Sequence, residues 1–295
     1  MLVQLGKREP KPEWLKVRMP GSGRYHSVRR TLRELGLHTV CEEASCPNMG
    51  ECWGSGTATV MLMGDVCTRG CRFCDVASGT PPPLDPLEPR HLAEAVGRLG
   101  LDYLVVTSVN RDELSDGGAS HFAQAIVELR RAAPRTLVEV LTPDFQGSVE
   151  ALEMIIDAAP TVAAHNLETV ERLTPRVRDR RATYRQSLQV LAHYKRGGMR
   201  TKSSIMLGLG ERREEVLQAM RDLRSVGCDI LTLGQYLRPS EKHLPVEEFV
   251  RPEVFAELEQ QGIGLGFRFV AAGPLVRSSY KAGEFFVQRW VDGGA

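Results

Sequence analysis

Three cysteines, Cys67, Cys71 and Cys74, fall within eight residues directly after an apolar run. Thiolates are soft ligands that suit iron–sulfur clusters and zinc. A cubane cluster held by three thiolates leaves one iron free to bind another molecule, whereas structural zinc needs four ligands and usually pairs two C-x-x-C halves. Only one such half occurs here. The ligand count therefore favours an open [4Fe-4S] cluster over a zinc knuckle.

A second triplet, Cys41, Cys46 and Cys52, lies just ahead of the first. Proline and glycine between these cysteines favour turns, so the thiols can converge without sharing a helix. A zinc site completed by His38 is the alternative, but three soft ligands favour a second iron–sulfur cluster. The remaining cysteine, Cys228, adjoins a β-like run and is expected to be a small buried core residue.

These cysteines need a scaffold, and the rest of the chain predicts an α/β fold. Seven short β-rich runs are nearly continuous in apolar residues, which is typical of parallel strands covered on both faces. They span residues 58–63, 103–107, 137–141, 161–164, 203–207, 230–233 and 267–271. Alternation of such strands with helices over about six repeats predicts a partial (β/α)6 TIM-type barrel that stays open.

Between the strands, apolar residues recur at the i, i+4, i+7 spacing of helices that face a core. The expected core stripes are Leu92, Val96 and Leu99; Phe122, Ile126 and Leu129; Val149, Leu152 and Ile156; and Val216, Met220 and Leu223. Prolines 81, 82, 83, 86 and 89 indicate a stiff surface loop.

The first cysteine triplet follows the first barrel strand, so it is expected on the carboxyl-end face where barrel enzymes build their sites. Thr107, Ser108 and Asn110 follow the second strand, and His165 and Asn166 follow the fourth. These polar residues should meet at the same mouth. They could be ordinary loop residues, or they could bind a zwitterionic ligand and a ribose.

The motifs as a set resemble a known enzyme family. C-x3-C-x2-C with an aromatic residue before its last cysteine is similar to the signature of the radical S-adenosylmethionine (SAM) enzymes. With C-x4-C-x5-C ahead of it, the chain from about Cys41 to Ala282 resembles the lipoyl synthases within that group. Other stretches that carry the resemblance are Gly56-Thr57-Ala58-Thr59, Asp75-Val76, Pro82-Pro83-Leu84-Asp85, Ser108-Val109-Asn110-Arg111-Asp112, Asp116-Gly117-Gly118, His165-Asn166-Leu167-Glu168-Thr169, Gln235-Tyr236-Leu237 and Arg277-Ser278-Ser279-Tyr280.

This resemblance implies two [4Fe-4S] clusters and SAM as cofactors. The first cluster would cleave SAM to a 5'-deoxyadenosyl radical. The radical would take a hydrogen from C6 and then C8 of an octanoyl chain on a carrier-protein lysine, and sulfide from the second cluster would trap each carbon radical. An unactivated C–H bond is far too weak an acid for acid–base chemistry, so a cofactor must carry this step.

The resemblance also implies residue roles. Ser279 would be the fourth ligand of the second cluster, with Arg277 guarding that site, and the methionine amino group would lie near Thr107 and Ser108. The ribose would lie near Asn166 and Glu168. Residues 1–54 would form an N-terminal extension, 55–272 the radical SAM barrel and 273–295 a C-terminal extension, with the two extensions meeting over the barrel mouth.

One stretch, Ser204 to Glu211, departs from the G-x-I-x-G-x-x-E pattern of related enzymes, because Ser204 stands where glycine is usual. If this position required a positive φ, serine would bear a cost. Gly208 and Gly210 do not make a dinucleotide fingerprint, because the third glycine is missing.

Composition limits the partners and the location. The net charge of +1 over 295 residues gives no reason to expect nucleic acid, and no apolar run reaches membrane-spanning length. The amino terminus lacks an apolar signal-peptide segment, and cysteine triplets suit a reducing compartment, so a cytoplasmic protein is expected. The family resemblance implies an octanoylated lipoyl carrier domain, an electron donor and a cluster-repair protein as partners.

Residues 1–40 are strongly basic, with nine Lys or Arg against three Glu. A solvated arm is the simpler interpretation of such a run. The alternative is a dock for an acidic partner through Arg29, Arg30 and Arg33.

Two further functions remain open at this point. One is a radical SAM enzyme of another kind, such as a methylthio-transfer or biotin-type sulfur-inserting enzyme, although the second cysteine triplet and the Arg277-to-Tyr280 motif argue against it. The other is a non-enzymatic electron carrier with two clusters, which predicts four-cysteine ligation and no cleavage of SAM.

Overall fold

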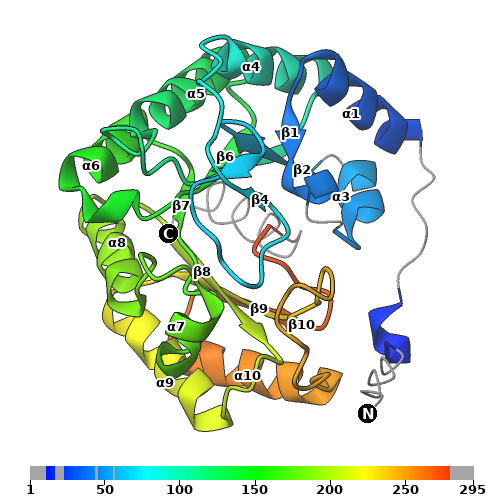
Figure 1. Ribbon diagram of the computed structural model, residues 1–295, viewed down its shortest axis with the longest axis vertical. Coiled ribbons are helices and arrows are strands. Elements are labelled where there is room, and N and C mark those ends of the chain that lie inside the picture. The colour runs from blue at the N-terminus through cyan, green and yellow to red at the C-terminus, as the bar shows by residue number, and fades with distance from the viewer. Residues whose placement is uncertain (1–10, 17–22, 44–45, 56, 280–295) are drawn as a thin grey trace, which may run out of the picture.

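Seven parallel strands form the centre of the molecule, and one short antiparallel strand extends their sheet (Figure 1). The computed structural model describes residues 11–16, 23–43, 46–55 and 57–279. In sheet order the strands are β1 (His38–Thr39), β2 (Thr57–Leu62), β5 (Tyr103–Ser108), β6 (Leu137–Leu141), β7 (Val162–Ala164), β8 (Thr201–Leu207), β9 (Ile230–Gln235) and β10 (Phe269–Gly273). Within these described residues β1 and β10 are the edges of the sheet, so the barrel is open, as predicted.

Six helices connect successive parallel strands and form an outer ring around the sheet (Figure 1). They are α4 (Glu88–Leu99), α5 (Ala119–Ala132), α6 (Val149–Ala158), α8 (Tyr184–Arg196), α9 (Arg213–Ser225) and α10 (Pro252–Gly264). The remaining described elements are α1 (Gly23–Glu34), α2 (Val40–Glu43), α3 (Met49–Ser55), α7 (Thr174–Val177), β3 (Val66–Cys67), β4 (Ala77–Ser78) and the 3-10 turns η1 (Glu13–Leu15), η2 (Phe145–Gly147) and η3 (Glu171–Leu173). The arrangement confirms a partial (β/α)6 barrel that ends on one further strand.

The core lies between the sheet and this ring. All residues of β2 and β9 are buried, as expected for parallel strands covered on both faces. The predicted stripe of α5 is confirmed, because Phe122, Ile126 and Leu129 are completely buried. The stripe of α9 is confirmed in the same way.

The predicted stripe of α6 is wrong at its first residue. Val149 is 51% exposed and the predicted Ile156 is half-buried, while Leu152 and Ile155 are buried. The helix begins at Val149, with the Ser148 hydroxyl accepting the Ala151 N–H as its N-cap. The buried face of α6 therefore runs through Leu152 and Ile155, an i, i+3 step, and leaves out the first residue of the helix.

The proline-rich segment is a surface loop only in its first part. Pro89 is buried in the first turn of α4, where proline fits because its missing N–H has no helical partner. The neighbouring Glu88 is also buried, and its carboxylate accepts the Met63 N–H at 2.9 Å and lies 2.6 Å from Nε2 of His121. Cys228 is a buried core residue, as predicted.

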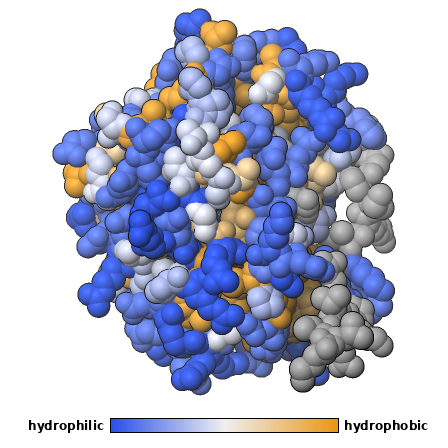
Figure 2. Space-filling view, viewed as in Figure 1, coloured by the Kyte–Doolittle hydropathy of each residue, from blue (hydrophilic) through white to orange (hydrophobic). Residues whose placement is uncertain are grey.

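The carboxyl ends of the strands converge at the centre of the ring in Figure 1, where the segment that carries β3 and β4 crosses. The two extensions meet there, because Asn48 Nδ2 donates a 2.6 Å hydrogen bond to the Leu275 carbonyl. The same face is covered mainly by hydrophilic residues, with hydrophobic residues in small scattered groups (Figure 2). No helix in the described part of the chain is long and apolar enough to span a bilayer.

Candidate functional site

A cavity of about 480 Å³ lies at the mouth of the barrel. This volume is within the range of about 300–1,000 Å³ typical of small-molecule sites. The predicted site residues on its wall are Cys41, Cys46, Cys67, Cys71, Cys74, Thr107, Ser108, Asn110, Asn166, Glu168, Arg277 and Ser279. Cys52 is a predicted ligand that does not line the cavity; it is buried on α3.

The loop that carries the first triplet presents its sulfurs to backbone donors. Cys67 ends β3, and its Sγ accepts the N–H groups of Arg69 at 3.4 Å and Asn110 at 3.3 Å. Cys71 Sγ accepts the N–H of Asp179 at 3.3 Å. Donors aimed at sulfur favour the thiolate form, which is the form that binds metal.

Burial acts on these thiols in the opposite direction. It raises the pKa of Cys74 and of Cys41 to about 12 each, and it also raises the pKa of Cys71. A buried thiolate therefore needs a positively charged partner, which a bound metal supplies. Among the described residues no three His, Cys, Asp or Glu side chains converge closely enough for a single ion, whereas a cubane takes one thiolate on each iron and tolerates a wider spread.

The second triplet sits where the two extensions meet. Cys41 lies in α2, and its carbonyl accepts the N–H of Cys46 at 3.0 Å. Arg277 Nη1 donates to the Gln235 carbonyl at 3.2 Å, and burial lowers the pKa of Arg277 while the neighbouring Cys46 opposes that effect. Ser279 is half-buried on the cavity wall. Tyr280 and the residues after it lie outside the described part of the chain.

The fit of the C-terminal segment depends on a glycine at the end of β9. A Cβ at Gly234 would lie 2.0 Å from the Val276 carbonyl oxygen, closer than any contact allows. The absence of a side chain thus lets residues 273–279 pack onto the strand end. This packing brings Arg277 and Ser279 to the mouth.

The polar residues predicted to bind SAM have free hydrogen-bonding capacity on the wall. Ser108 Oγ and Asn166 Oδ1 are buried without a protein partner. Asn166 Nδ2 donates to Glu168 Oε1 at 3.1 Å, and Glu168 adopts a left-handed φ of 66°. Burial raises the pKa of Glu168, with Arg178 opposing. Of the seven buried side-chain atoms without a partner in the described residues, these two are the ones on the cavity wall, where a ligand can pair them.

Ser204 carries no backbone strain, because it lies inside β8 and its φ is not positive. The positive φ values of this stretch fall at Gly208 and Gly210, each with φ 97°. A Cβ at Gly208 would lie 2.4 Å from the Glu248 carbonyl oxygen. The substitution of serine for glycine at 204 is therefore compatible with the family pattern.

The basic N-terminal segment is partly used within the chain. Arg29 and Arg33 on α1 both bind Glu42, at 3.2 Å and 2.9 Å, one residue from Cys41. Arg30 is 74% exposed and lies 3.8 Å from Glu34. Lys7, Arg8 and Arg18 lie outside the described residues. Two of the three arginines therefore support the second cysteine segment.

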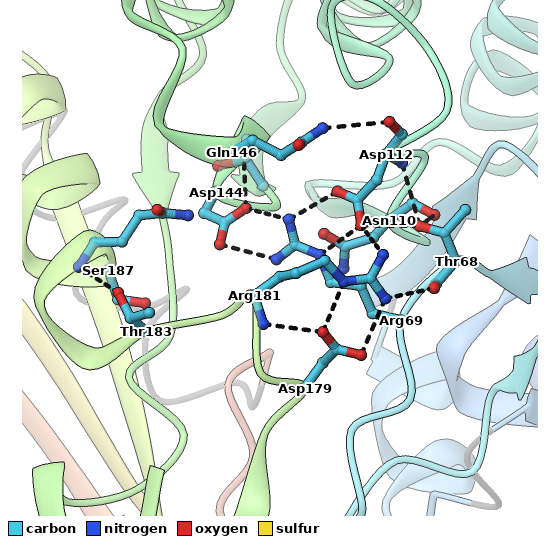
Figure 3. A network of polar contacts seen from close by, with 12 residues as sticks. Thr68, Arg69, Asn110, Asp112, Asp144, Gln146, Asp179, Arg181, Thr183 and Ser187 are labelled. Carbon is cyan, nitrogen blue, oxygen red and sulfur yellow. Dashed lines mark hydrogen bonds and ion pairs between the residues drawn. The ribbon is translucent and has the colours of Figure 1, made fainter. Parts of the chain in front are cut away.

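Sequence reasoning missed the ion pairs that hold the first cysteine loop (Figure 3). Arg69, inside the C-x3-C spacing, is buried and binds both Asp112 and Asp144 at 2.7–2.8 Å. The available signal was that Asp112 and Asp144 follow the ends of neighbouring strands, at the edge where the cysteine loop was expected.

Comparison with known proteins identifies the family of the chain. The Radical SAM superfamily matches residues 61–223, and the N-terminal domain of lipoyl synthase of that family matches residues 2–46. A lipoyl synthase of Anaeromyxobacter sp. (strain Fw109-5) is 65% identical over 281 residues, covering 94% of this chain and 95% of that protein. The chain belongs to the lipoyl synthase family.

Other members of the lipoyl synthase family give the same result. The enzyme of Thermus thermophilus is 59% identical, covering 94% of this chain and 87% of that protein. The mitochondrial enzyme of Branchiostoma floridae is 57% identical, covering 96% and 77%. The fold is shared with more distant structures, including methylornithine synthase (TM-score 0.55, 12% identity, covering 94% and 90%).

The chain is thus a radical SAM enzyme whose cofactors are SAM and [4Fe-4S] clusters. The residues present fit these groups. Soft thiolate ligands in two groups face one cavity, and none of the seven cysteines forms a disulfide. Orphaned polar atoms at Ser108 and Asn166 remain for the nucleoside and amino-acid parts of SAM.

Proposed function

We propose that this chain inserts two sulfur atoms, at C6 and C8, into a protein-bound octanoyl-lysine to give the lipoyl cofactor. The observation that carries the proposal is the convergence of two cysteine groups on one cavity. Cys41 and Cys46 come from the N-terminal extension, and Cys67, Cys71 and Cys74 come from the loop after the first barrel strand. An alkyl chain between the two groups would be within reach of both.

In this proposal Cys67, Cys71 and Cys74 hold the cluster that binds SAM, while Cys41, Cys46, Cys52 and Ser279 hold the second cluster. When bound, these groups supply one-electron cleavage of SAM, a radical able to abstract hydrogen from an alkyl chain, and sulfide. The serine oxygen is a hard ligand and therefore a weak partner for iron, so it can be displaced more easily than a thiolate.

The polar wall orients SAM. Ser108 Oγ and Asn166 Oδ1 are the unpaired groups that can take up hydrogen bonds from the ligand. Thr107 Oγ1 already donates to the Leu141 carbonyl at 2.9 Å, so it acts toward a ligand as an acceptor. Asn110 and Glu168 complete this part of the wall.

The apolar part of the wall holds the octanoyl chain and excludes water. Met61, Val109, Leu141 and Ile205 line the cavity alongside the two cysteine groups. Exclusion of water protects a reactive carbon centre from side reactions. Fixing the chain close to both sites also converts an encounter of separate molecules into a step within one complex.

The three sequence regions then divide the work. Residues 55–272 bind SAM and its cluster, and the extensions 1–54 and 273–295 together bind the second cluster. The hydrogen bond from Asn48 to Leu275, which joins the two extensions, supports this division. The carrier would be an octanoylated lipoyl domain, with an electron donor and a cluster-repair protein as further partners. Seven cysteines without a disulfide support a reducing compartment such as the cytoplasm.

The test is product analysis with anaerobically reconstituted protein, dithionite, SAM and an octanoylated carrier domain. The proposal expects 5'-deoxyadenosine and a carrier whose mass rises by two sulfurs with no added methyl group. A methylthio product would support a different radical SAM reaction. If no 5'-deoxyadenosine formed at all, the proposal would fail and the result would favour an electron carrier.

A further inference from the structure

A second segment, distant in sequence, clamps the outer side of the cluster loop. Residues 177–181, which begin at the last residue of α7, run beside residues 68–72. The Arg72 N–H donates to the Val177 carbonyl at 2.9 Å. We call residues 177–181 the strap.

Asp179 makes two opposed hydrogen bonds to adjacent residues of the loop. Its backbone N–H donates to Cys71 Sγ at 3.3 Å, and its carboxylate Oδ2 accepts the Gly70 N–H at 3.0 Å. The two bonds close a ring between residue 179 and residues 70–71. Loss of the carboxylate would therefore free the N–H that points at the sulfur.

Arg181 fixes the Asp179 carboxylate in this position (Figure 3). Its guanidinium binds both carboxylate oxygens of Asp179, at 2.8 Å and 3.0 Å, and its Nη2 also donates to the Thr68 carbonyl at 2.7 Å. Nη1 lies 3.1 Å from Asp112 Oδ2. A planar guanidinium can make all these contacts together, whereas a lysine ammonium cannot.

The inner side of the loop is held by Arg69, whose guanidinium is buried between Asp112 and Asp144. Thr68 adds a hydroxyl hydrogen bond to Asp112 Oδ2 at 3.1 Å. The loop between Cys67 and Cys71 is therefore bound on both sides. The strap provides the N–H that donates to Cys71 Sγ. The ion pairs of Arg69 hold the loop in the position where Cys71 accepts this hydrogen bond.

We propose that Asp179 and Arg181 are positioning residues that hold the Asp179 N–H on Cys71 and so set the reduction potential of the cluster at the first triplet. This inference rests on the proposed function, in which Cys71 is a cluster ligand. Hydrogen bonds to cluster sulfurs are among the features that set such potentials. An N–H dipole directed at sulfur stabilises the more negative, reduced state and raises the potential.

The direction in which the reduction potential changes distinguishes a positioning role of Asp179 and Arg181 from a direct effect of their charges. If the side chains acted only through their charges, loss of the Asp179 carboxylate would make reduction easier and loss of the Arg181 guanidinium would make it harder. If they hold the N–H in place, Asp179→Ala and Arg181→Gln both lower the potential. Arg181→Lys keeps the charge but cannot bridge, so it also gives a lower potential.

The experiment is an EPR-monitored redox titration without SAM. The full-length chain carries Cys41→Ala, Cys46→Ala and Cys52→Ala, so that a single cluster contributes the signal. We expect each strap variant to lower the equilibrium constant for one-electron reduction roughly tenfold, which is about 59 mV. Arg172→Gln is the matched control, because Arg172 likewise binds both oxygens of a carboxylate, that of Glu215, and a backbone carbonyl, that of Gly210, and none of these three residues lines the cavity.

Hydrogen exchange in the chain with all its cysteines gives a second reading of the same contact. The amides of Gly70 and Asp179 should exchange roughly tenfold faster in the strap variants, and no faster in Arg172→Gln. Opposite shifts of potential in Asp179→Ala and Arg181→Gln, or unchanged potential and exchange, would overturn the inference while leaving the proposed function intact. Absence of iron and sulfide from the first triplet would overturn both.

Discussion

The segment from Cys67 to Cys74 and the segment from Cys41 to Cys52 present thiols to the same cavity, but they are held differently. The first is fixed by buried ion pairs of Arg69 and by backbone donors to Cys67 and Cys71. The second is held by the packing of Cys41, Cys52 and Trp53 in the main core and by hydrogen bonds such as that from Asn48 to Leu275, and its described contacts include no buried ion pair.

The difference suits two different duties. A cluster that binds SAM in every cycle needs fixed ligands, because small displacements of a reacting group are costly. In the proposed function the second cluster gives up sulfide and must be rebuilt, and a segment held without buried ion pairs opens more easily than the first loop. The comparison thus links the buried ion pairs of the first segment to a cluster that stays fixed, and the second segment to a cluster that is lost and rebuilt.

The largest expected effect is on catalysis, where loss of a cysteine from each triplet should abolish a different step. Cys71→Ala should abolish formation of 5'-deoxyadenosine, because the cluster that binds SAM loses a ligand. Cys41→Ala should still cleave SAM but form no lipoyl product, because only the sulfur source is lost. Each variant should lose about half of the iron after reconstitution. Loss of SAM cleavage in Cys41→Ala would show that the sites are not independent.

The second prediction concerns the stability of the first loop. Arg69→Gln leaves Asp112 and Asp144 without their buried partner, and breaking a buried ion pair in this way typically costs about 3–5 kcal/mol. Denaturant unfolding under anaerobic conditions should show a loss of this size. Arg172→Gln, at a surface ion pair, should cost at most about 1 kcal/mol. Equal losses of unfolding free energy in the two variants would mean that the ion pairs of Arg69 stabilise the fold no more than a surface ion pair does.

Local sequence patterns predicted the strands and the mouth well, because apolar runs and the order of βα units determine where strand ends meet. They failed for contacts between distant segments. Arg69 and Asp144 are 75 residues apart, and Asp179 lies 108 residues from Cys71, so no local pattern marks either contact. The position of Val149 failed for a local reason, since the exact start of a helix decides which face its first residue joins.

A smaller effect is expected from His165, which is buried on the cavity wall. Its Nδ1 donates to the Thr142 carbonyl at 2.9 Å and its Nε2 accepts from the Ser187 hydroxyl at 2.9 Å, since that hydroxyl already accepts a hydrogen bond from Arg178. Burial, with Arg178 adding to it, lowers the pKa of His165 to about 4. The folded protein therefore holds this histidine neutral.

The unfolded chain protonates His165 near pH 6.5, whereas the folded chain does so only near pH 4. Stability linked to this group is therefore complete above pH 6.5 and is lost as the pH falls through that window, by up to about 3 kcal/mol. His165→Gln should flatten the pH dependence of the free energy of unfolding between these limits. An unchanged slope would show that the folded histidine accepts a proton as readily as the unfolded one.

The smallest effect on stability is expected from Asn48, although it bears most directly on the second segment. Asn48→Ala removes one hydrogen bond to Leu275 and should lower the free energy of unfolding by about 1 kcal/mol. Asn48→Asp should lower it further, because a carboxylate would face the Leu275 carbonyl oxygen. In both variants SAM cleavage should persist while sulfur insertion falls, since the segment that carries Ser279 is no longer tied to the cysteines. Parallel assays of 5'-deoxyadenosine and lipoyl product measure this ratio, and an equal fall in both products would place Asn48 in the support of the whole mouth rather than of the second cluster alone.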